Sequence, residues 1–178
     1  MKKQILVISA SPRKGGNSDT LCDEFIKGVQ DAGNQAEKIF LRDKKIGYCM
    51  ACDGCKRNPG VCVQKDDMAD ILNKMIAADA IVLATPVYFY TMDAQLKTLI
   101  DRCVARYKEM ENKDIYFIAT AAAGKEAMER TMESLRGFTA CLKGAVEKGA
   151  IYGAEVWEKG AVLSSPAMQQ AYDMGRSA

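Results

Sequence analysis

Residues 5–18 read ILVISASPRKGGNS, and this stretch decides the fold class. Its first half is a continuous aliphatic run, as expected of a strand that is covered on both faces of a parallel sheet. Its second half is a small polar turn containing two glycines. Apolar residues at helical spacing follow at once, from Leu21 to Val29, and Gly33 closes that helix. Strand, tight turn and helix in this order predict the start of a βαβ unit.

The same alternation continues along the chain. Further strands are expected at residues 80–85 and 115–120, with weaker candidates at 36–41 and 150–157. Helices are expected at residues 68–76, 96–103, about 126–147 and 167–174. Five βα units with right-handed crossovers suit a doubly wound three-layer sandwich better than a barrel, which needs eight. Without repeats, low-complexity tracts or a linker, we expect one domain over residues 1–178.

Composition indicates an ordinary globular protein. The chain has 178 residues, of which 48% are hydrophobic and 27% charged, and its formal net charge is +2. Without a polybasic run, nucleic acid and anionic membranes are not expected as partners. No apolar stretch approaches the roughly 20 residues that span a bilayer, and the N-terminal run is too short for a signal peptide, so a cytoplasmic location is expected. There is no histidine, which removes the usual general base.

The turn after the first strand has the composition of an anion site. Backbone N–H groups and the positive end of a helix dipole converge there, and the glycines permit close approach. Ser11, Asn17 and Ser18 add hydroxyl and amide donors, and Arg13 adds a positive charge. The turn has neither the G-x-G-x-x-G pattern of dinucleotide sites nor the G-K-[ST] ending of a P-loop. The sequence therefore predicts a phosphate site, with a turn that merely caps the helix as the alternative.

A second notable loop follows the strand at residues 80–85 and reads TPVYFYTM over residues 85–92. Three consecutive aromatic side chains after a strand cannot all be core, so we expect at least one ring to face a cleft. A flat aromatic ligand would suit such a cleft. A hydrophobic contact between subunits is the alternative.

Four of the seven cysteines form one compact motif, C-x2-C-x2-C-x6-C. They are Cys49, Cys52, Cys55 and Cys62. Compact C-x2-C-x2-C runs are typical of [4Fe–4S] ligation. A zinc site with four thiolates and a loop of reduced thiols without metal are the alternatives. The other three, Cys22, Cys103 and Cys141, have apolar spacing on helices and are predicted to be small core residues.

Taken together, SASPRKGGNS, C-x2-C-x2-C-x6-C-x3-D-D-M and TPVYFY resemble the NADPH-dependent FMN reductase superfamily. The similarity covers about residues 3–145 and is greatest to the branch of iron–sulfur flavoproteins and multimeric flavodoxin-like proteins. The resemblance implies a flavodoxin-like sandwich with a five-stranded parallel sheet in the order 2-1-3-4-5 and helices on both faces. It also implies a homodimer or homotetramer.

The resemblance further implies a flavin site built from three loops. FMN phosphate would be bound by Ser11, Arg13, Asn17 and Ser18. The ribityl chain and ring would lie along Pro86, Val87, Tyr88, Phe89 and Tyr90, with Ala122 and Gly124 at the other edge of the flavin. The four-cysteine motif would hold a [4Fe–4S] cluster.

The implied activity is hydride transfer from NAD(P)H to FMN, followed by electron transfer to a quinone, flavin or protein acceptor, directly or through a cluster. The flavin carries this chemistry, so no catalytic side chain is predicted. An electron carrier without enzymatic activity is the first alternative. A metal-binding or redox-sensing module, in which the fold is only a scaffold for the cysteine loop, is the second.

Overall fold

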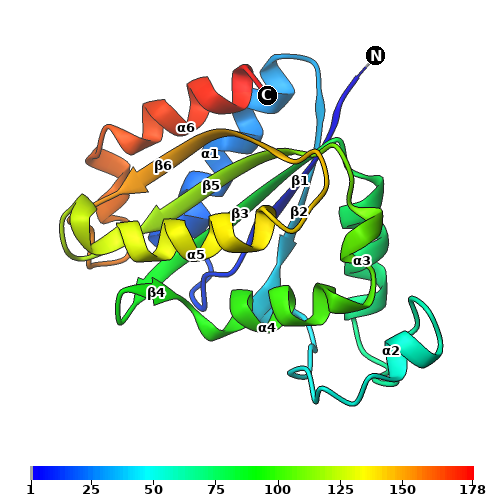
Figure 1. Cartoon of the computed structure of the whole chain (residues 1–178). Coiled ribbons are helices and arrows are strands. Elements are labelled where there is room, and N and C mark those ends of the chain that lie inside the picture. The colour runs from blue at the N-terminus through cyan, green and yellow to red at the C-terminus, as the bar shows by residue number, and fades with distance from the viewer. Residues whose placement is uncertain (1) are drawn as a thin grey trace.

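A computed structural model describes residues 2–178 and shows a central sheet of parallel strands (Figure 1). The strands are β1 (Gln4–Ser9), β2 (Gln35–Phe40), β3 (Ala80–Tyr88), β5 (Asp114–Thr120) and β6 (Val146–Gly153). Their order across the sheet is β2-β1-β3-β5-β6, and a short β4 (Thr91–Met92) pairs antiparallel with the end of β3. Counting the parallel strands along the chain, this is the order 2-1-3-4-5, so the predicted flavodoxin-like topology is confirmed.

Helices cover both faces of the sheet (Figure 1). On one face lie α1 (Asn17–Asp31) and α6 (Ala167–Arg176), and on the other lie α3 (Met68–Ala77), α4 (Ala94–Arg102) and α5 (Glu129–Thr139). The short α2 (Gly54–Arg57) lies outside these layers. Single turns of 3-10 helix occur at Leu41–Asp43, Cys103–Ala105, Tyr107–Glu109, Lys125–Met128 and Ala161–Ser164. None of the helices in residues 2–178 is long and apolar enough to cross a membrane.

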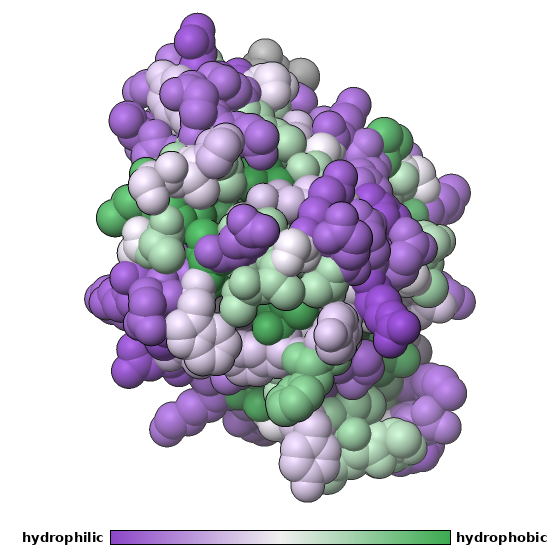
Figure 2. Space-filling view, turned by 90° about the vertical axis from the view of Figure 1, so that its left-hand side faces the viewer, coloured by the Kyte–Doolittle hydropathy of each residue, from purple (hydrophilic) through white to green (hydrophobic). Residues whose placement is uncertain are grey.

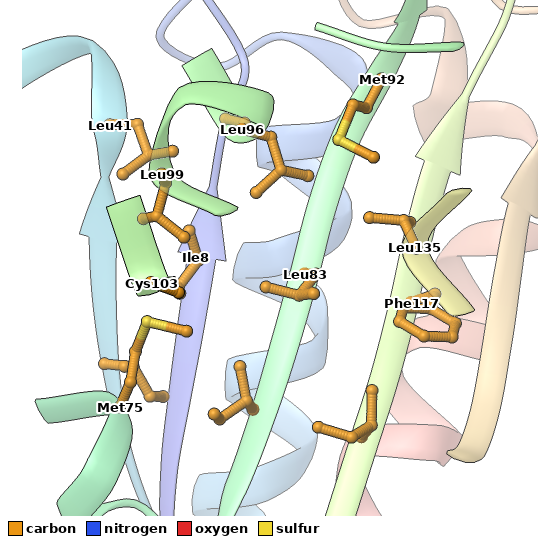
Figure 3. Packing of buried hydrophobic residues seen from close by; sticks show 14 of the residues in the cluster. Ile8, Leu41, Met75, Leu83, Met92, Leu96, Leu99, Cys103, Phe117 and Leu135 are labelled. Carbon is orange, nitrogen blue, oxygen red and sulfur yellow. The ribbon is translucent and has the colours of Figure 1, made fainter. Parts of the chain in front are cut away.

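The sheet separates two hydrophobic cores. Alternate residues of β1 supply both, since Leu6 and Ile8 pack beneath α3, α4 and α5 while Ile5 and Val7 pack beneath α1 and α6. Figure 3 shows Leu96 of α4 and Leu135 of α5 over the first of these faces. Burial on both faces explains why β1 reads as a continuous apolar run rather than an alternating one.

The helices α1 and α6 approach each other through two glycines. A Cβ atom on Gly28 of α1 would collide with the carbonyl oxygen of Tyr172, and one on Gly175 of α6 would collide with the carbonyl oxygen of Phe25. The two backbones are therefore in direct contact, and only glycine fits at these positions. This contact fastens the C-terminal helix beside the helix that follows the polar turn.

The largest differences from the predicted boundaries lie between α5 and β6, while β3 extends three residues beyond its predicted end, to Tyr88. The helix expected over residues 126–147 ends at Thr139, and the chain then turns, with Gly144 at a φ of 72°. Residues from Val146 form β6, so the strand expected at 150–157 begins four residues earlier. β6 is an edge strand whose first residues are exposed, and burial therefore demands no apolar run there.

Candidate functional site

The three loops predicted to meet do lie at one edge of the sheet. Residues 11–18 form the turn after β1 and the start of α1, residues 86–90 form the end of β3 and the turn after it, and residues 121–124 follow β5. The parallel register aligns these strand ends, because Ala10 N–H donates to Ala84 O at 2.9 Å and Pro86 lies opposite Thr120. Figure 2 looks onto the side toward which β5 and β6 run, and there pale and green side chains gather amid hydrophilic ones. In open α/β sheets ligands bind at this edge.

The buried Asp19 carboxylate stabilises the turn after β1. Its Oδ1 accepts from Ser9 Oγ at 2.8 Å, and its Oδ2 accepts from Gly15 N–H at 2.9 Å. The second bond holds Gly15 at a φ of 66°, a left-handed conformation that glycine adopts without strain. Burial alone would raise the pKa of Asp19, but the hydrogen bonds from Gly15, Lys38 and Ser9 hold this pKa below its usual value. Asp19 is therefore ionised and stabilises the turn through its hydrogen bond with Gly15.

The first turn of α1 leaves donors available. Gly16 is the N-cap and supplies no side-chain cap, and the first N–H groups of a helix have no acceptor inside it. Ser18 is 1% exposed, yet its Oγ has no hydrogen-bond partner within residues 2–178. A buried hydroxyl without a partner is costly unless a ligand satisfies it. Ser18 and the helix terminus thus fit a phosphate group.

The Asn17 side chain is bonded to a distant segment of the chain in this structure. Its Nδ2 donates to Glu158 O at 2.9 Å and to Val156 O at 3.3 Å, and its Oδ1 accepts from Gly160 N–H at 3.0 Å. The Asn17 amide therefore fastens the segment after β6 to the start of α1. Of the other predicted phosphate ligands, Ser11 Oγ donates to Arg13 O at 2.8 Å, and the Arg13 side chain lies on the surface.

The aromatic loop is a tight hairpin. Val87 pairs with Met92 and Tyr88 with Thr91, so Phe89 and Tyr90 are the two turn residues. Both have positive φ, at 49° and 66°, the pattern of a type I′ turn, in which Asn-Gly is usual. Bulky residues in this region store strain of about 1–3 kcal/mol each, and such strain clusters at functional sites. Phe89 is fully exposed, so the prediction that these rings are not all core is confirmed.

The loop after β5 faces this hairpin. Tyr90, Gly124 and Arg130 line a shared open hollow, together with Ala123, Glu126 and Ala127. The Arg130 guanidinium lies 5.9 Å from the centre of the Tyr90 ring, a cation–π contact that ties the hairpin to α5. Ala122 is exposed beside the hollow and does not line it.

The four-cysteine loop forms a separate pocket. Cys49, Cys52, Cys55 and Cys62 all line one cavity of about 540 Å³ between this loop, α4 and the end of α5. The donor set fits an iron–sulfur or zinc centre in chemical kind. In the part of the chain that the structure describes, however, no three His, Cys, Asp or Glu side chains converge closely enough to hold a metal ion. The loop as it stands brings the thiols to one cavity but not to ligation geometry.

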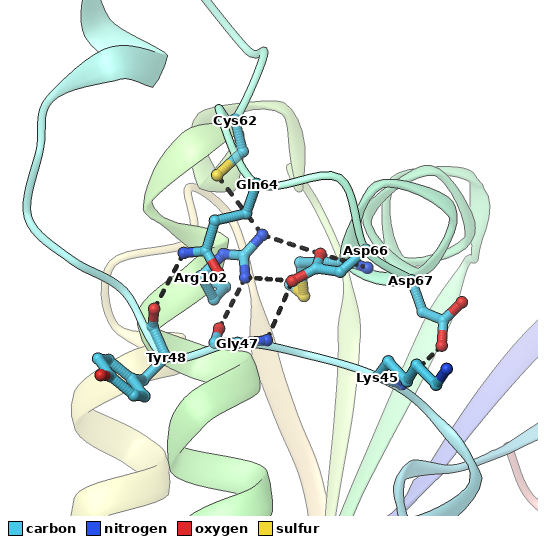
Figure 4. A network of polar contacts seen from close by, with 9 residues as sticks. Lys45, Gly47, Tyr48, Cys62, Gln64, Asp66, Asp67 and Arg102 are labelled. Atoms are coloured by element: carbon cyan, nitrogen blue, oxygen red, sulfur yellow. Dashed lines mark hydrogen bonds and ion pairs between the residues drawn. The ribbon is translucent and has the colours of Figure 1, made fainter.

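A buried ion pair anchors the cysteine loop to α4 (Figure 4). Arg102 donates from Nη1 to Asp66 Oδ2 at 2.7 Å and to Gly47 O at 2.7 Å. Its Nη2 contacts Cys62 Sγ at 3.4 Å. Burial tends to raise the pKa of Asp66, but the hydrogen bonds from Arg102 and from the Gly47 and Met68 N–H groups lower it. No sequence motif marked Arg102, whose role depends on contacts between residues far apart in the chain.

The remaining cysteines divide into two kinds. Cys22 and Cys103 are buried as predicted, and burial raises the pKa of both thiols, that of Cys103 to about 12. Cys141 is exposed and lines the cysteine cavity, so the prediction of a core position is wrong for this residue. The helix expected to bury it ends at Thr139, two residues earlier.

The chain is similar in sequence to proteins of one known family. Residues 3–158 match the family described as NADPH-dependent FMN reductase. An iron–sulfur flavoprotein of Archaeoglobus fulgidus is 42% identical over 95 residues, which are 53% of this chain and 43% of that protein. An iron–sulfur flavoprotein of Methanocaldococcus jannaschii is 36% identical over 137 residues, 76% of this chain and 70% of that protein. The match thus spans less than half of the first relative.

Among solved structures, an azoreductase from Bacillus anthracis superposes with a TM-score of 0.80 over 100% of both chains. At 15% sequence identity this likeness shows the fold alone.

Proposed function

Because the chain belongs to the NADPH-dependent FMN reductase family, we propose that it binds FMN at the carboxyl edge of its sheet and passes electrons from NAD(P)H to an acceptor. The observation that carries this proposal is the buried Ser18 hydroxyl at the uncapped start of α1, which has no hydrogen-bond partner within residues 2–178. It lies in the first turn of α1, directly after the turn that follows β1 and at the same sheet edge as the strained aromatic hairpin and the loop after β5. In this proposal the Ser18 hydroxyl and the start of α1 would meet the phosphate of FMN, and the hairpin and the loop after β5 would meet its ring.

The residues of the chain would bind and orient the cofactor rather than transfer protons. Ser18, Arg13 and the first N–H groups of α1 would hold the phosphate, while Tyr88 and Tyr90 would offer aromatic surface to the ring. When bound, FMN accepts two electrons as hydride and releases them singly or in pairs. Hydride transfer needs no side-chain acid or base, in keeping with a chain that has no histidine.

We propose in addition that Cys49, Cys52, Cys55 and Cys62 hold a [4Fe–4S] cluster. Two observations support this: all four thiols line one cavity, and relatives at 36–42% identity are iron–sulfur flavoproteins. Holding a cluster would require the loop to draw its thiols together. Arg102 would remain beneath the loop as an anchor and as a donor to Cys62.

Purification without oxygen, with an absorption spectrum and iron and sulfide assays, tests both proposals. Flavin bands with iron and sulfide near four per chain would support a flavoprotein with a cluster. Flavin bands with zinc, or with no metal, would support the proposed flavin site and contradict the proposed cluster. A protein that stays colourless after incubation with FMN would contradict the proposed function.

A turnover assay separates a reductase from an electron carrier. NAD(P)H oxidation with a quinone, a free flavin or a dye as acceptor is expected to be rapid if the chain is a reductase. A flavin-loaded protein that reacts with neither nucleotide would instead favour the carrier. We also propose a homodimer or homotetramer, because the fully exposed Phe89 offers an apolar tip to a second subunit. Light scattering of the purified protein tests that assembly.

A further inference from the structure

Lys159 lies against the turn after β1, although 140 or more residues separate it from that turn in the sequence. Its Cε lies 3.3 Å and its Nζ 3.5 Å from the position that a Cβ on Gly15 would take. The absence of a side chain on Gly15 therefore makes room for the Lys159 ammonium group. A larger residue at position 15 would displace it.

The segment that carries Lys159 is fixed in place by Asn17. The Asn17 amide bonds the backbone on both sides of Lys159, donating to Glu158 O at 2.9 Å and accepting from Gly160 N–H at 3.0 Å. A longer bond of 3.4 Å reaches Val162 N–H. An exposed lysine in an unattached loop would sample many positions, but the backbone of this one is clamped to the first residue of α1. Asn17 is thus a positioning residue for Lys159.

The charges around the turn favour an anion. Within residues 2–178, Arg13, Lys14 and Lys159 form no ion pair, whereas the neighbouring Lys38 pairs with Asp19 and Asp23. The oxygens of Asp19 are occupied by Gly15, Ser9 and Lys38. Three cations that form no ion pair within residues 2–178 therefore lie in the turn before a 15-residue helix, as Arg13 and Lys14 do, or against that turn, as Lys159 does. A dianionic group bound at the turn, as a phosphate monoester supplies, would be attracted to these charges and to the helix terminus.

We infer that Lys159 is a phosphate-binding residue, supplied to the turn after β1 by the segment that follows β6. The inference rests on the proposed function, since the ligand it names is the 5′-phosphate of FMN. It goes beyond the family match, which ends at residue 158. Lys159 would contact the phosphate and not the ring, so it would distinguish FMN from riboflavin.

The test measures the binding of FMN and riboflavin by the full-length protein after removal of bound flavin. Trp157, the single tryptophan, is 73% exposed two residues from Lys159, so its fluorescence reports flavin binding. Lys159→Met is expected to weaken FMN binding about tenfold, the size of one charge-assisted hydrogen bond. Riboflavin binding should stay unchanged, and Lys159→Arg should restore most of the FMN affinity. The FMN affinity of Lys159→Met should also depend less steeply on salt concentration.

Lys143→Met is the matched control. It removes one positive charge from an exposed side chain that pairs with Glu111, next to the amino end of β6, and should leave both affinities unchanged. Equal FMN affinity in Lys159→Met and wild type would overturn the inference, as would an equal loss for FMN and riboflavin. Failure of the wild type to bind FMN would instead overturn the proposed function, and the inference with it.

Discussion

Arg102 and Asp66 form a forked ion pair, with Nη1 2.7 Å from Oδ2 and Nη2 3.0 Å from Oδ1. Only 2% of the Arg102 side chain is exposed. The pair joins α4 to the end of the cysteine loop, and Arg102 also holds Gly47 at the loop's beginning. One buried guanidinium thus gathers both ends of a loop that has little regular structure of its own (Figure 4).

Replacing Arg102 with Met should destabilise the protein strongly. The change leaves the Asp66 carboxylate partly buried without its partner, which typically costs about 3–5 kcal/mol. Urea unfolding measures this loss. Arg136→Met provides the control, because Arg136 forms a similar fork with Glu147 but both side chains are about one third exposed. The control should lose about 0–1 kcal/mol, and equal losses in the two variants would contradict an anchoring role for Arg102.

Asp93 should make stability depend on pH in the unusual direction. Burial raises its pKa to about 7, against hydrogen bonds from Leu96 N–H and with Thr85 that lower it, whereas the unfolded chain has a pKa near 3.8. Between these values the folded state keeps a proton that the unfolded state releases. This contribution is fully present below about pH 4 and is lost as the pH rises through 7; three pKa units correspond to an upper limit of about 4 kcal/mol.

Asp93→Asn should remove that dependence. The amide oxygen can still accept from Leu96 N–H, where Asp93 Oδ1 now accepts at 3.1 Å, and the side chain stays neutral at every pH. Free energies of unfolding at pH 5 and pH 8 should therefore differ less in the variant than in the wild type. An identical difference in both proteins would show that Asp93 does not carry this proton.

The glycine contact between α1 and α6 yields a third prediction. Gly175→Ala should cost about 1–3 kcal/mol or more, because the new methyl group meets the Phe25 carbonyl oxygen and the helices must separate. Gly137→Ala is the matched control within α5, where a Cβ would meet nothing within 4 Å. There alanine should stabilise the helix by about 0.5–1 kcal/mol. Thermal unfolding of the two variants should shift in opposite directions, and a shift in the same direction would contradict the contact.

Much of the fold is predictable because burial dictates it locally. β1, β3 and β5 are covered on both faces, so their apolar runs are continuous and visible in the sequence. β6 has no such continuous apolar run, because it is an edge strand whose first residues, Val146 to Lys148, are exposed. Composition there is compatible with helix, and only pairing with β5 decides the matter.

The candidate site likewise has parts that the sequence predicts and parts that it does not. The polar turn, the aromatic loop and the cysteine spacing are local patterns, and each can be recognised before the structure is known. The hydrogen bonds of the Asn17 side chain cannot be recognised in this way, because their partners lie about 140 residues away in the sequence. From the sequence alone, we predict that the Asn17 amide binds a ligand. The roles of Arg102 and Lys159 cannot be predicted from the sequence for the same reason. Tertiary contacts place them, and no residue pattern near them indicates a site.

The strained hairpin gives the last prediction. Replacing Phe89 with Asn and Tyr90 with Gly would install the sequence that a type I′ turn prefers. Relief of two positive-φ positions should raise stability by about 1–3 kcal/mol. If the strained aromatics are kept for the flavin, FMN binding should weaken about tenfold at the same time, because aromatic contacts are worth about 0.5–1.5 kcal/mol each. Fluorescence titration and urea unfolding measure the two effects.

Tyr48→Ser serves as the control, since Tyr48 is an exposed aromatic of the cysteine loop, and neither quantity should change. A hairpin variant that gains stability and keeps full FMN affinity would mean that the strain serves something other than the flavin. The fully exposed Phe89 would then belong to contacts between subunits, and the same variant should shift the assembly toward monomers in light scattering. A variant that loses stability would show that contacts such as the Arg130 cation–π pair outweigh the backbone strain.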